Sequence, residues 1–162
     1  MYLCPKLNKS QCPSNELERE DMKNEPYSRL VGSLIYAQVC TRPDFAYVMG
    51  MLARFKSNLG HEHWIAGKKV LRYLQKTKSY QLFYRRVDEL EVMGYSNVDF
   101  ARQYPEPGKS TSGYVFMLVG GTIAWKTVKQ TQTATSTMMA EYIAIHEAKC
   151  QGLWLKKFLV AN

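Results

Sequence analysis

Apolar residues follow a helical period through the first half of the chain. From Pro26 onward they recur at spacings of three and four, at Leu30, Leu34, Ile35 and Val39. A later run of the same kind begins near Glu62, with apolar positions at Trp64, Ile65, Val70, Leu71 and Leu74. The segment Thr41-Arg42-Pro43-Asp44 interrupts the pattern, and we expect Thr41 to cap a second helix that ends near Asn58. Residues 26–78 are therefore predicted to form three helices.

The second half changes to a period of two, which is typical of strands. It predicts strands over residues 80–86, 90–96, 113–119 and 122–129, with a turn at residues 87–89. Gly120-Gly121 is predicted as a two-residue hairpin turn, because both positions tolerate a positive φ.

A long helix is predicted after the last strand. Its expected buried face consists of Met138, Tyr142, Ile145, Ala148, Gly152, Leu155 and Leu159. The predicted fold class is α+β or α/β, with a basic helical lead-in followed by antiparallel strands and one long helix. We expect a flexible lead over residues 1–25, the helical segment over 26–78 and a strand-rich domain over 79–162.

The positive charge is unevenly distributed along the chain. Residues 1–86 hold 15 lysines and arginines against 7 acidic residues, whereas residues 87–162 hold 7 of each. A basic first half suggests contact with RNA or DNA, and a solvated basic surface without a partner is the alternative. The candidate phosphate-binding residues are Lys68, Lys69, Arg72, Lys76, Lys78, Arg85 and Arg86.

Cysteine spacing and hydropathy exclude several other classes of protein. None of the four cysteines forms a C-x-x-C pair, and His61-Glu62-His63 lacks the H-E-x-x-H spacing, so we expect no metal site and a solvated helix start there. No run of apolar residues is long enough to span a membrane. Residues 1–15 lack the apolar core of a secretory signal. The expected location is intracellular, in cytoplasm or nucleus, and secretion without a recognisable signal peptide followed by entry into host-cell cytoplasm or nucleus is the alternative.

Several motifs together resemble one known family. Five of them are Gly32-Ser33-Leu34-Ile35-Tyr36, Thr41-Arg42-Pro43-Asp44, Gly94-Tyr95-Ser96-Asn97-Val98-Asp99-Phe100-Ala101, Lys109-Ser110-Thr111-Ser112-Gly113-Tyr114 and Ala140-Glu141-Tyr142. In order and spacing they resemble the end of the reverse transcriptase and the truncated ribonuclease H domain of Ty1/copia-type retrotransposon Pol polyproteins. The resemblance covers roughly residues 26–160 and implies an incomplete ribonuclease H-like fold.

The resemblance also implies a chemistry for which the sequence lacks most of the residues. Ribonuclease H uses two Mg²⁺ ions held by four acidic residues. The first of these positions is Asn97, the second is Glu141, and the remaining two would lie beyond Asn162. Asp99 matches an acidic family position that is not a metal ligand, and we do not expect it to substitute. The implied protein is a degenerate ribonuclease H without metal or other cofactor.

Three functions remain open from the sequence. The first is a catalytically inactive copia-type fragment that acts, if at all, through binding. The second is a secreted RxLR-type effector of a plant pathogen, acting on a host protein inside plant cells to modulate cell death or immunity. Sequences of this kind are also described as such effectors, although the nearest R-x-L-R match, Arg72-Tyr73-Leu74-Gln75, lacks the final arginine. The third is a non-specific nucleic-acid-binding module.

Overall fold

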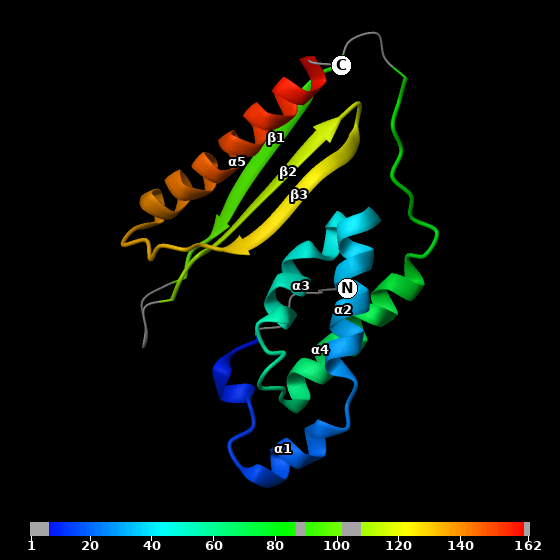
Figure 1. Ribbon diagram of the computed structural model, residues 1–162, viewed down its shortest axis with the longest axis vertical. Helices are drawn as coiled ribbons and strands as arrows, with labels where there is room; N and C mark the ends of the chain where they lie inside the picture. The colour runs from blue at the N-terminus through cyan, green and yellow to red at the C-terminus, as the bar shows by residue number, and fades with distance from the viewer. Residues whose placement is uncertain (1–6, 87–89, 102–107, 161–162) are drawn as a thin grey trace. The chain divides into compact units, whose positions relative to one another are not determined.

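The structure is a computed structural model that describes residues 7–86, 90–101 and 108–160. The chain divides into two compact units, residues 1–81 and residues 82–162. Each unit has its own secondary structure (Figure 1). None of the helices in the described ranges is long and apolar enough to cross a membrane.

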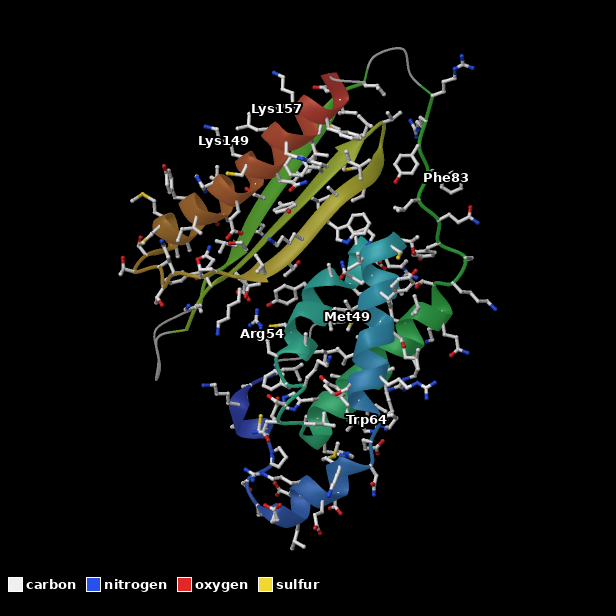
Figure 2. The ribbon with its side chains drawn as sticks, viewed as in Figure 1. Met49, Arg54, Trp64, Phe83, Lys149 and Lys157 are labelled. Atoms are coloured by element: carbon white, nitrogen blue, oxygen red, sulfur yellow. The ribbon has the colours of Figure 1, made fainter. Side chains whose placement is uncertain are left out.

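The first unit is helical. Its elements are η1 (Lys9–Gln11), α1 (Glu16–Lys23), α2 (Tyr27–Thr41), η2 (Pro43–Phe45), α3 (Ala46–Ala53) and α4 (His61–Lys76). The apolar stripes of α2, α3 and α4 meet in one core, and Met49 lies within it (Figure 2). The core residues are Tyr27, Val31, Leu34, Phe45, Val48, Met49, Leu52, Ala66 and Val70. The predicted third helix is confirmed at α4, and residues 16–23 of the predicted lead form α1.

The break at Thr41-Arg42-Pro43-Asp44 differs from the prediction in its details. Thr41 is the last residue of α2, and Arg42 is the flanking residue before η2, so the predicted Thr41 cap is wrong. Pro43 opens η2, where its missing N–H costs nothing. The predicted single helix to Asn58 is a short 3₁₀ turn followed by α3, which ends at Ala53.

The second unit contains a sheet and one long helix. Strands β1 (Val92–Asp99), β2 (Thr111–Leu118) and β3 (Gly121–Lys129) form an antiparallel sheet in the order β1-β2-β3. Helix α5 (Thr137–Val160) packs along β1 and β2 on one face of this sheet (Figure 1). The α+β class is confirmed, and the element order is that of the first part of a ribonuclease H-like fold.

The predicted strand at residues 80–86 is wrong. This segment is irregular, and it meets the hairpin of β2 and β3 through two hydrogen bonds. The Arg85 N–H donates to the Val119 carbonyl at 3.3 Å, and the Tyr84 hydroxyl donates to the Thr122 carbonyl at 2.9 Å. The turn predicted at residues 87–89 lies outside the described residues.

The β2–β3 hairpin turn is shifted by one residue from the prediction. Val119 and Gly120 take the positive φ values, 56° and 80°, whereas Gly121 is already the first residue of β3. Gly121 is buried, and a Cβ there would lie 2.5 Å from the Tyr84 ring and 2.7 Å from the Phe83 carbonyl oxygen. A glycine is needed at position 121 because of this close approach, not because of backbone conformation.

The predicted buried face of α5 is wrong in its first half. Met138, Tyr142 and Ile145 are 79%, 71% and 54% exposed. The residues that pack on the sheet here are Ala140 and Ala144, followed by Leu155 further along the helix. Small residues bring the helix close to β1 and β2, and the longer apolar side chains are left on its outer side.

Candidate functional site

Four basic side chains share one exposed face of α4. Lys68, Lys69, Arg72 and Lys76 are all exposed, and their spacing places them within about 100° of the helix circumference. The opposite side of the helix is buried through His63, Ala66, Gly67 and Val70. We call these four cations the α4 basic face.

An aromatic ring lies beside the α4 basic face. The Lys68 ammonium lies 5.1 Å from the centroid of the half-buried Trp64 ring, which is within the range of a cation–π interaction. This contact limits the directions that the Lys68 side chain takes. A row of cations next to a half-buried aromatic ring suits a polyanion that also carries flat bases.

The C-terminal end of α4 is fixed by a buried arginine from the α2–η2 junction. The Arg42 guanidinium binds both carboxylate oxygens of Asp44, at 3.0 and 2.7 Å. It also donates to the Thr77 hydroxyl at 2.6 Å, at the residue that follows α4. Arg42 is 7% exposed and the Asp44 side chain is one-third exposed, so this bidentate ion pair holds the helix from a partly buried position.

Asp44 also receives a hydrogen bond from α4 itself. The Tyr73 hydroxyl donates to Asp44 Oδ2 at 2.8 Å. Burial would raise the pKa of Asp44, but hydrogen bonds from Arg42 and Tyr73 outweigh it and hold that pKa below its ordinary value. Sequence reasoning missed this arrangement, although an arginine two residues before an aspartate at a predicted helix break was a signal for it.

The N-terminal end of α4 depends on a buried histidine. His63 is fully buried, so the predicted solvated helix start is wrong at this residue. Its ring stacks on Phe55 with 3.9 Å between centroids, and its Nδ1 accepts the Gly60 N–H at 3.0 Å. Burial lowers the pKa of His63, so the neutral imidazole is favoured.

The other predicted phosphate-binding residues lie elsewhere. Lys78 is exposed and follows α4 within the first unit. Arg85 and Arg86 are exposed but belong to the second unit, on the irregular segment before β1. The structure therefore groups Lys68, Lys69, Arg72 and Lys76 on one helix face.

The predicted catalytic positions on β1 point away from α5. The Phe116 ring lies against Gly152 of α5, so Phe116 is on the face of the sheet that α5 covers. A Cβ on Gly94 would lie 2.5 Å from the same ring, so position 94 of β1 is on that face too. The β1–β2 register is unbroken from Val92 to Asp99. Alternation along the strand therefore places Asn97 and Asp99 on the opposite face.

The Asn97 side chain is turned onto its own backbone. Its Oδ1 accepts the Val98 N–H at 2.9 Å, so the one oxygen that this neutral amide could offer a cation already has a hydrogen-bond donor on one of its two lone pairs. Glu141 is exposed near the start of α5, on the helix side of the sheet. Asn97 and Glu141 therefore lie on opposite sides of the sheet.

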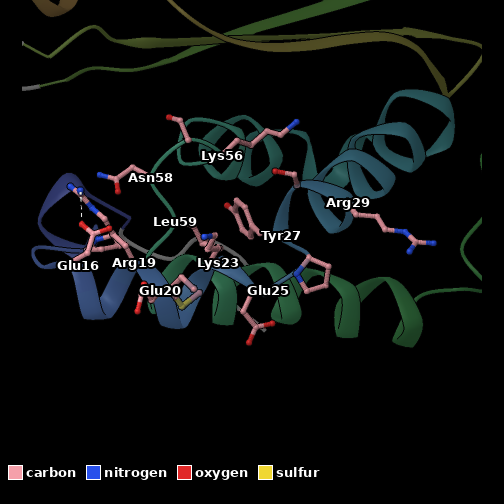
Figure 3. A pocket seen from close by; sticks show the side chains of 15 residues that line it. Glu16, Arg19, Glu20, Lys23, Glu25, Tyr27, Arg29, Lys56, Asn58 and Leu59 are labelled. Atoms are coloured by element: carbon pink, nitrogen blue, oxygen red, sulfur yellow. Dashed lines mark ion pairs between the residues drawn. The ribbon is translucent and has the colours of Figure 1, made fainter.

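A separate hollow of about 820 Å³ lies among α1, the start of α2 and the loop after α3 (Figure 3). Its rim mixes both charges, and Arg19 forms an ion pair with Glu16 at 3.6 Å. The cations around it are Arg19, Lys23, Arg29 and Lys56, and the acids are Glu16, Glu20 and Glu25. This balance gives the hollow no preference for an anion or a cation.

Comparison with known proteins shows similarity to retrotransposon polyproteins. Over 95% of its length the chain is 44% identical to the Retrovirus-related Pol polyprotein from transposon TNT 1-94 of Nicotiana tabacum. Over 82% of its length it is 32% identical to the Retrovirus-related Pol polyprotein from transposon RE2 of Arabidopsis thaliana. The chain belongs to the Ty1/copia-type Pol family. It spans about a tenth of the length of these two polyproteins, 11% and 9%.

A relative of similar length to this Ty1/copia-type chain carries a different name. The chain is 44% identical to Secreted RxLR effector protein 161 of Plasmopara viticola, over 83% of this chain and 94% of that protein. No family model matches the chain, and no solved structure matches it. The resemblance to Ty1/copia Pol proteins noted in the sequence is confirmed by these relatives.

The two residues at the metal-binding positions of the Ty1/copia-type family, Asn97 and Glu141, do not fit a pair of Mg²⁺ ions. Such a site needs several carboxylate oxygens converging on one point. Asn97 supplies a neutral amide whose oxygen is already hydrogen-bonded, and Glu141 lies on the other side of the sheet. Among the residues that the structure describes, no three His, Cys, Asp or Glu side chains are grouped so that they could hold a metal ion.

Proposed function

We propose that this Ty1/copia-type chain is catalytically silent and acts through binding. The observation that carries the proposal is Asn97, which stands at the first metal-binding position of the family with its oxygen bound to the Val98 N–H. A neutral amide removes one of the negative charges that two divalent cations need. We propose no metal ion and no other cofactor for this chain.

We infer further that the ligand is RNA or DNA and that the α4 basic face binds its phosphates. Four cations on one exposed helix face concentrate the positive charge that attracts the phosphates of a nucleic-acid backbone. The Arg42–Asp44 pair and the buried His63 fix the two ends of α4, so the four side chains project from a rigid support. Phosphate contacts of this kind do not read sequence, so the binding is non-specific.

The salt dependence of binding tests this role. We expect the affinity for a fluorescent RNA–DNA hybrid to fall steeply as salt rises. The variant Lys68→Gln/Lys69→Gln/Arg72→Gln should lower the slope of log affinity against log salt by about 3, since each phosphate contact contributes roughly 0.9. Fluorescence anisotropy across a salt series gives this slope.

A matched control removes three cations from the same unit but from another surface. Lys23→Gln/Arg29→Gln/Lys56→Gln changes exposed residues around the hollow of Figure 3 and leaves α4 intact. We expect this variant to keep the slope of the unmodified protein. Equal losses in the two triple variants would show that net charge alone drives binding, and undetectable or salt-insensitive binding would remove the proposal.

A second candidate function is that of a secreted effector that acts on a host protein inside plant cells. It is supported by the 44% identity to Secreted RxLR effector protein 161 across nearly all of that relative. In the structure, the nearest R-x-L-R match lies inside α4, where the Tyr73 hydroxyl is bound to Asp44. The segment is therefore part of the folded helix and is not an extended linear motif.

Export and uptake of tagged protein test this second candidate. A secreted effector would leave the cell that produces it, enter plant cells and reach their cytoplasm or nucleus. Its expression there would then change host cell death or immune responses. Retention of the tagged protein in the producing cell, together with no response on direct expression in plant cells, would rule the candidate out.

A further inference from the structure

Trp64 is the aromatic ring beside the α4 basic face. It lies near the N-terminal end of α4, in the first unit (Figure 2). The residue is half-buried, because it packs against the hydrophobic core of that unit. This packing restricts the rotamers of the side chain, so holding the ring against a ligand costs little further entropy.

Trp64 begins a row of side chains along α4. Lys68, Arg72 and Lys76 follow it at intervals of four residues, which places them on successive turns of the same helix surface. Neighbouring members of the row are about 6 Å apart along the helix axis. The three cations are exposed, so the row consists of one aromatic ring followed by three positive charges.

The contact between Lys68 and Trp64 covers part of the ring in the unbound protein. The Lys68 ammonium lies 5.1 Å from the centroid of the indole ring. Since Lys68 is exposed, the ring surface that it approaches is the one turned toward solvent. A cation–π contact at such a site is weak, whereas an ammonium forms charge-assisted hydrogen bonds with a phosphate. A phosphate close to α4 would therefore draw Lys68 away and leave this ring surface free.

Nucleic acids carry flat groups that can take the place of the Lys68 ammonium on the ring. Bases stack on aromatic side chains, and this stacking tolerates every base because each has a π face. In a duplex the faces of the bases are covered by their neighbours, whereas unpaired bases can be splayed out onto a protein ring. A ring next to phosphate-binding cations therefore suits a single strand better than a duplex.

We propose that the α4 basic face binds single-stranded RNA or DNA, with one unpaired base stacked on Trp64. The phosphates of the neighbouring nucleotides then lie on Lys68, Arg72 and Lys76, and the Lys68 ammonium exchanges the ring for a phosphate. This inference rests on the proposed nucleic-acid binding and adds which form of nucleic acid is preferred. The preference is for unpaired strands and not for a sequence, because stacking on a ring is sequence-tolerant.

Two probes with the same phosphates test the proposal on the full chain. One is a short fluorescent oligothymidine, and the other is an abasic strand of the same length built from tetrahydrofuran spacers. We expect oligothymidine to bind roughly tenfold more tightly, through the stacking of one base. This ratio should persist as salt rises, because stacking releases no counterions. After extrapolation to high salt, oligothymidine should also bind more tightly than the same strand paired in a duplex.

Variants of the ring assign the preference to Trp64. Trp64→Leu should bring the ratio between the two probes to about one and keep the salt slope, whereas Trp64→Phe should keep part of the ratio because a ring remains. Trp154→Leu is the matched control, because Trp154 is exposed on α5 of the second unit, and we expect it to leave the ratio unchanged. The comparison of probes on the unmodified chain stands even if Trp64→Leu fails to fold.

The outcomes separate this proposal from the one on which it rests. Equal affinity of the unmodified chain for the two probes, with the salt slope that depends on α4 still present, would overturn base stacking and leave phosphate binding in place. Tighter binding of the duplex after extrapolation to high salt would also overturn it, as would a ratio that Trp154→Leu removes and Trp64→Leu keeps. Salt-insensitive binding of both probes would remove both proposals.

Discussion

At the scale of single residues, His63 shows how burial selects a protonation state. The ring is fully buried, it stacks on Phe55, and its Nδ1 accepts the backbone N–H at the start of α4. A protonated ring would lose this acceptor and carry charge in a place without water. Burial therefore holds the pKa of His63 below its ordinary value.

The pH dependence of stability follows from this shift. In the unfolded chain a histidine takes up a proton near pH 6.5, whereas the folded protein resists it. The unfolded state thus binds more protons in mild acid, and the free energy of unfolding should fall as the pH drops below about 6.5. We expect His63→Gln to reduce this fall, since a glutamine can still accept the Gly60 N–H but does not titrate. Urea unfolding at several pH values measures it.

The control for this prediction is another histidine of the same helix. His61 is exposed, so His61→Gln should keep the loss of stability in acid shown by the unmodified protein. The interpretation of His63 would be contradicted if His63→Gln lost as much stability in acid as the unmodified chain. A loss of stability that is equal at every pH, with the fall in acid unchanged, would show a packing effect and no proton linkage.

Some residues of the site could be predicted from the sequence and others could not. The exposed cations of α4 were predictable, because lysines and arginines at helical spacing opposite an apolar stripe must face solvent. His63 was not, since a histidine next to His61 and Glu62 carries no sign of burial by itself. The turn of Asn97 away from α5 depends on the register of β1, which no local pattern determines.

At the scale of elements, the β2–β3 hairpin separates two reasons for using glycine. Gly120 has φ of 80° and open space around it, whereas Gly121 lies against the Tyr84 ring and the Phe83 carbonyl. The first glycine serves the turn and the second serves packing. Two adjacent glycines in the sequence could not reveal this division.

Substitutions at these two positions should therefore differ in cost. We expect Gly121→Ala to lower the free energy of unfolding by about 1–3 kcal/mol, because the added methyl group needs Tyr84 and Phe83 to shift. Gly120→Asn should cost less than about 0.5 kcal/mol, because asparagine tolerates a positive φ. Chemical denaturation of both variants measures the difference, and equal costs would contradict the assigned roles.

The errors at the element scale share a physical cause. Residues 80–86 have the alternation of a strand, yet the structure joins them to the hairpin through side-chain and isolated backbone hydrogen bonds. On α5, both the alanine stripe and the longer apolar stripe repeat at helical spacing. Periodicity could not decide which stripe packs on the sheet, because tertiary contacts with β1 and β2 select the small residues.

At the scale of the whole molecule, charge divides between the two units. Residues 1–81 carry 13 lysines and arginines against 7 acidic residues, and residues 82–162 carry 9 against 7. The first unit also holds the α4 basic face, whereas the second holds Asn97 and Glu141. We infer that attraction to nucleic acid belongs to the first unit.

One experiment tests the central proposal, binding without catalysis, most directly. The full chain is incubated with a labelled RNA–DNA hybrid at a concentration that saturates binding, with Mg²⁺ and separately with Mn²⁺. Glu141→Gln is the control, because it removes the one carboxylate retained at a family metal position. We expect a bound and intact hybrid in both samples. Cleavage by the unmodified chain that disappears in Glu141→Gln would show a working metal site and would contradict the proposal.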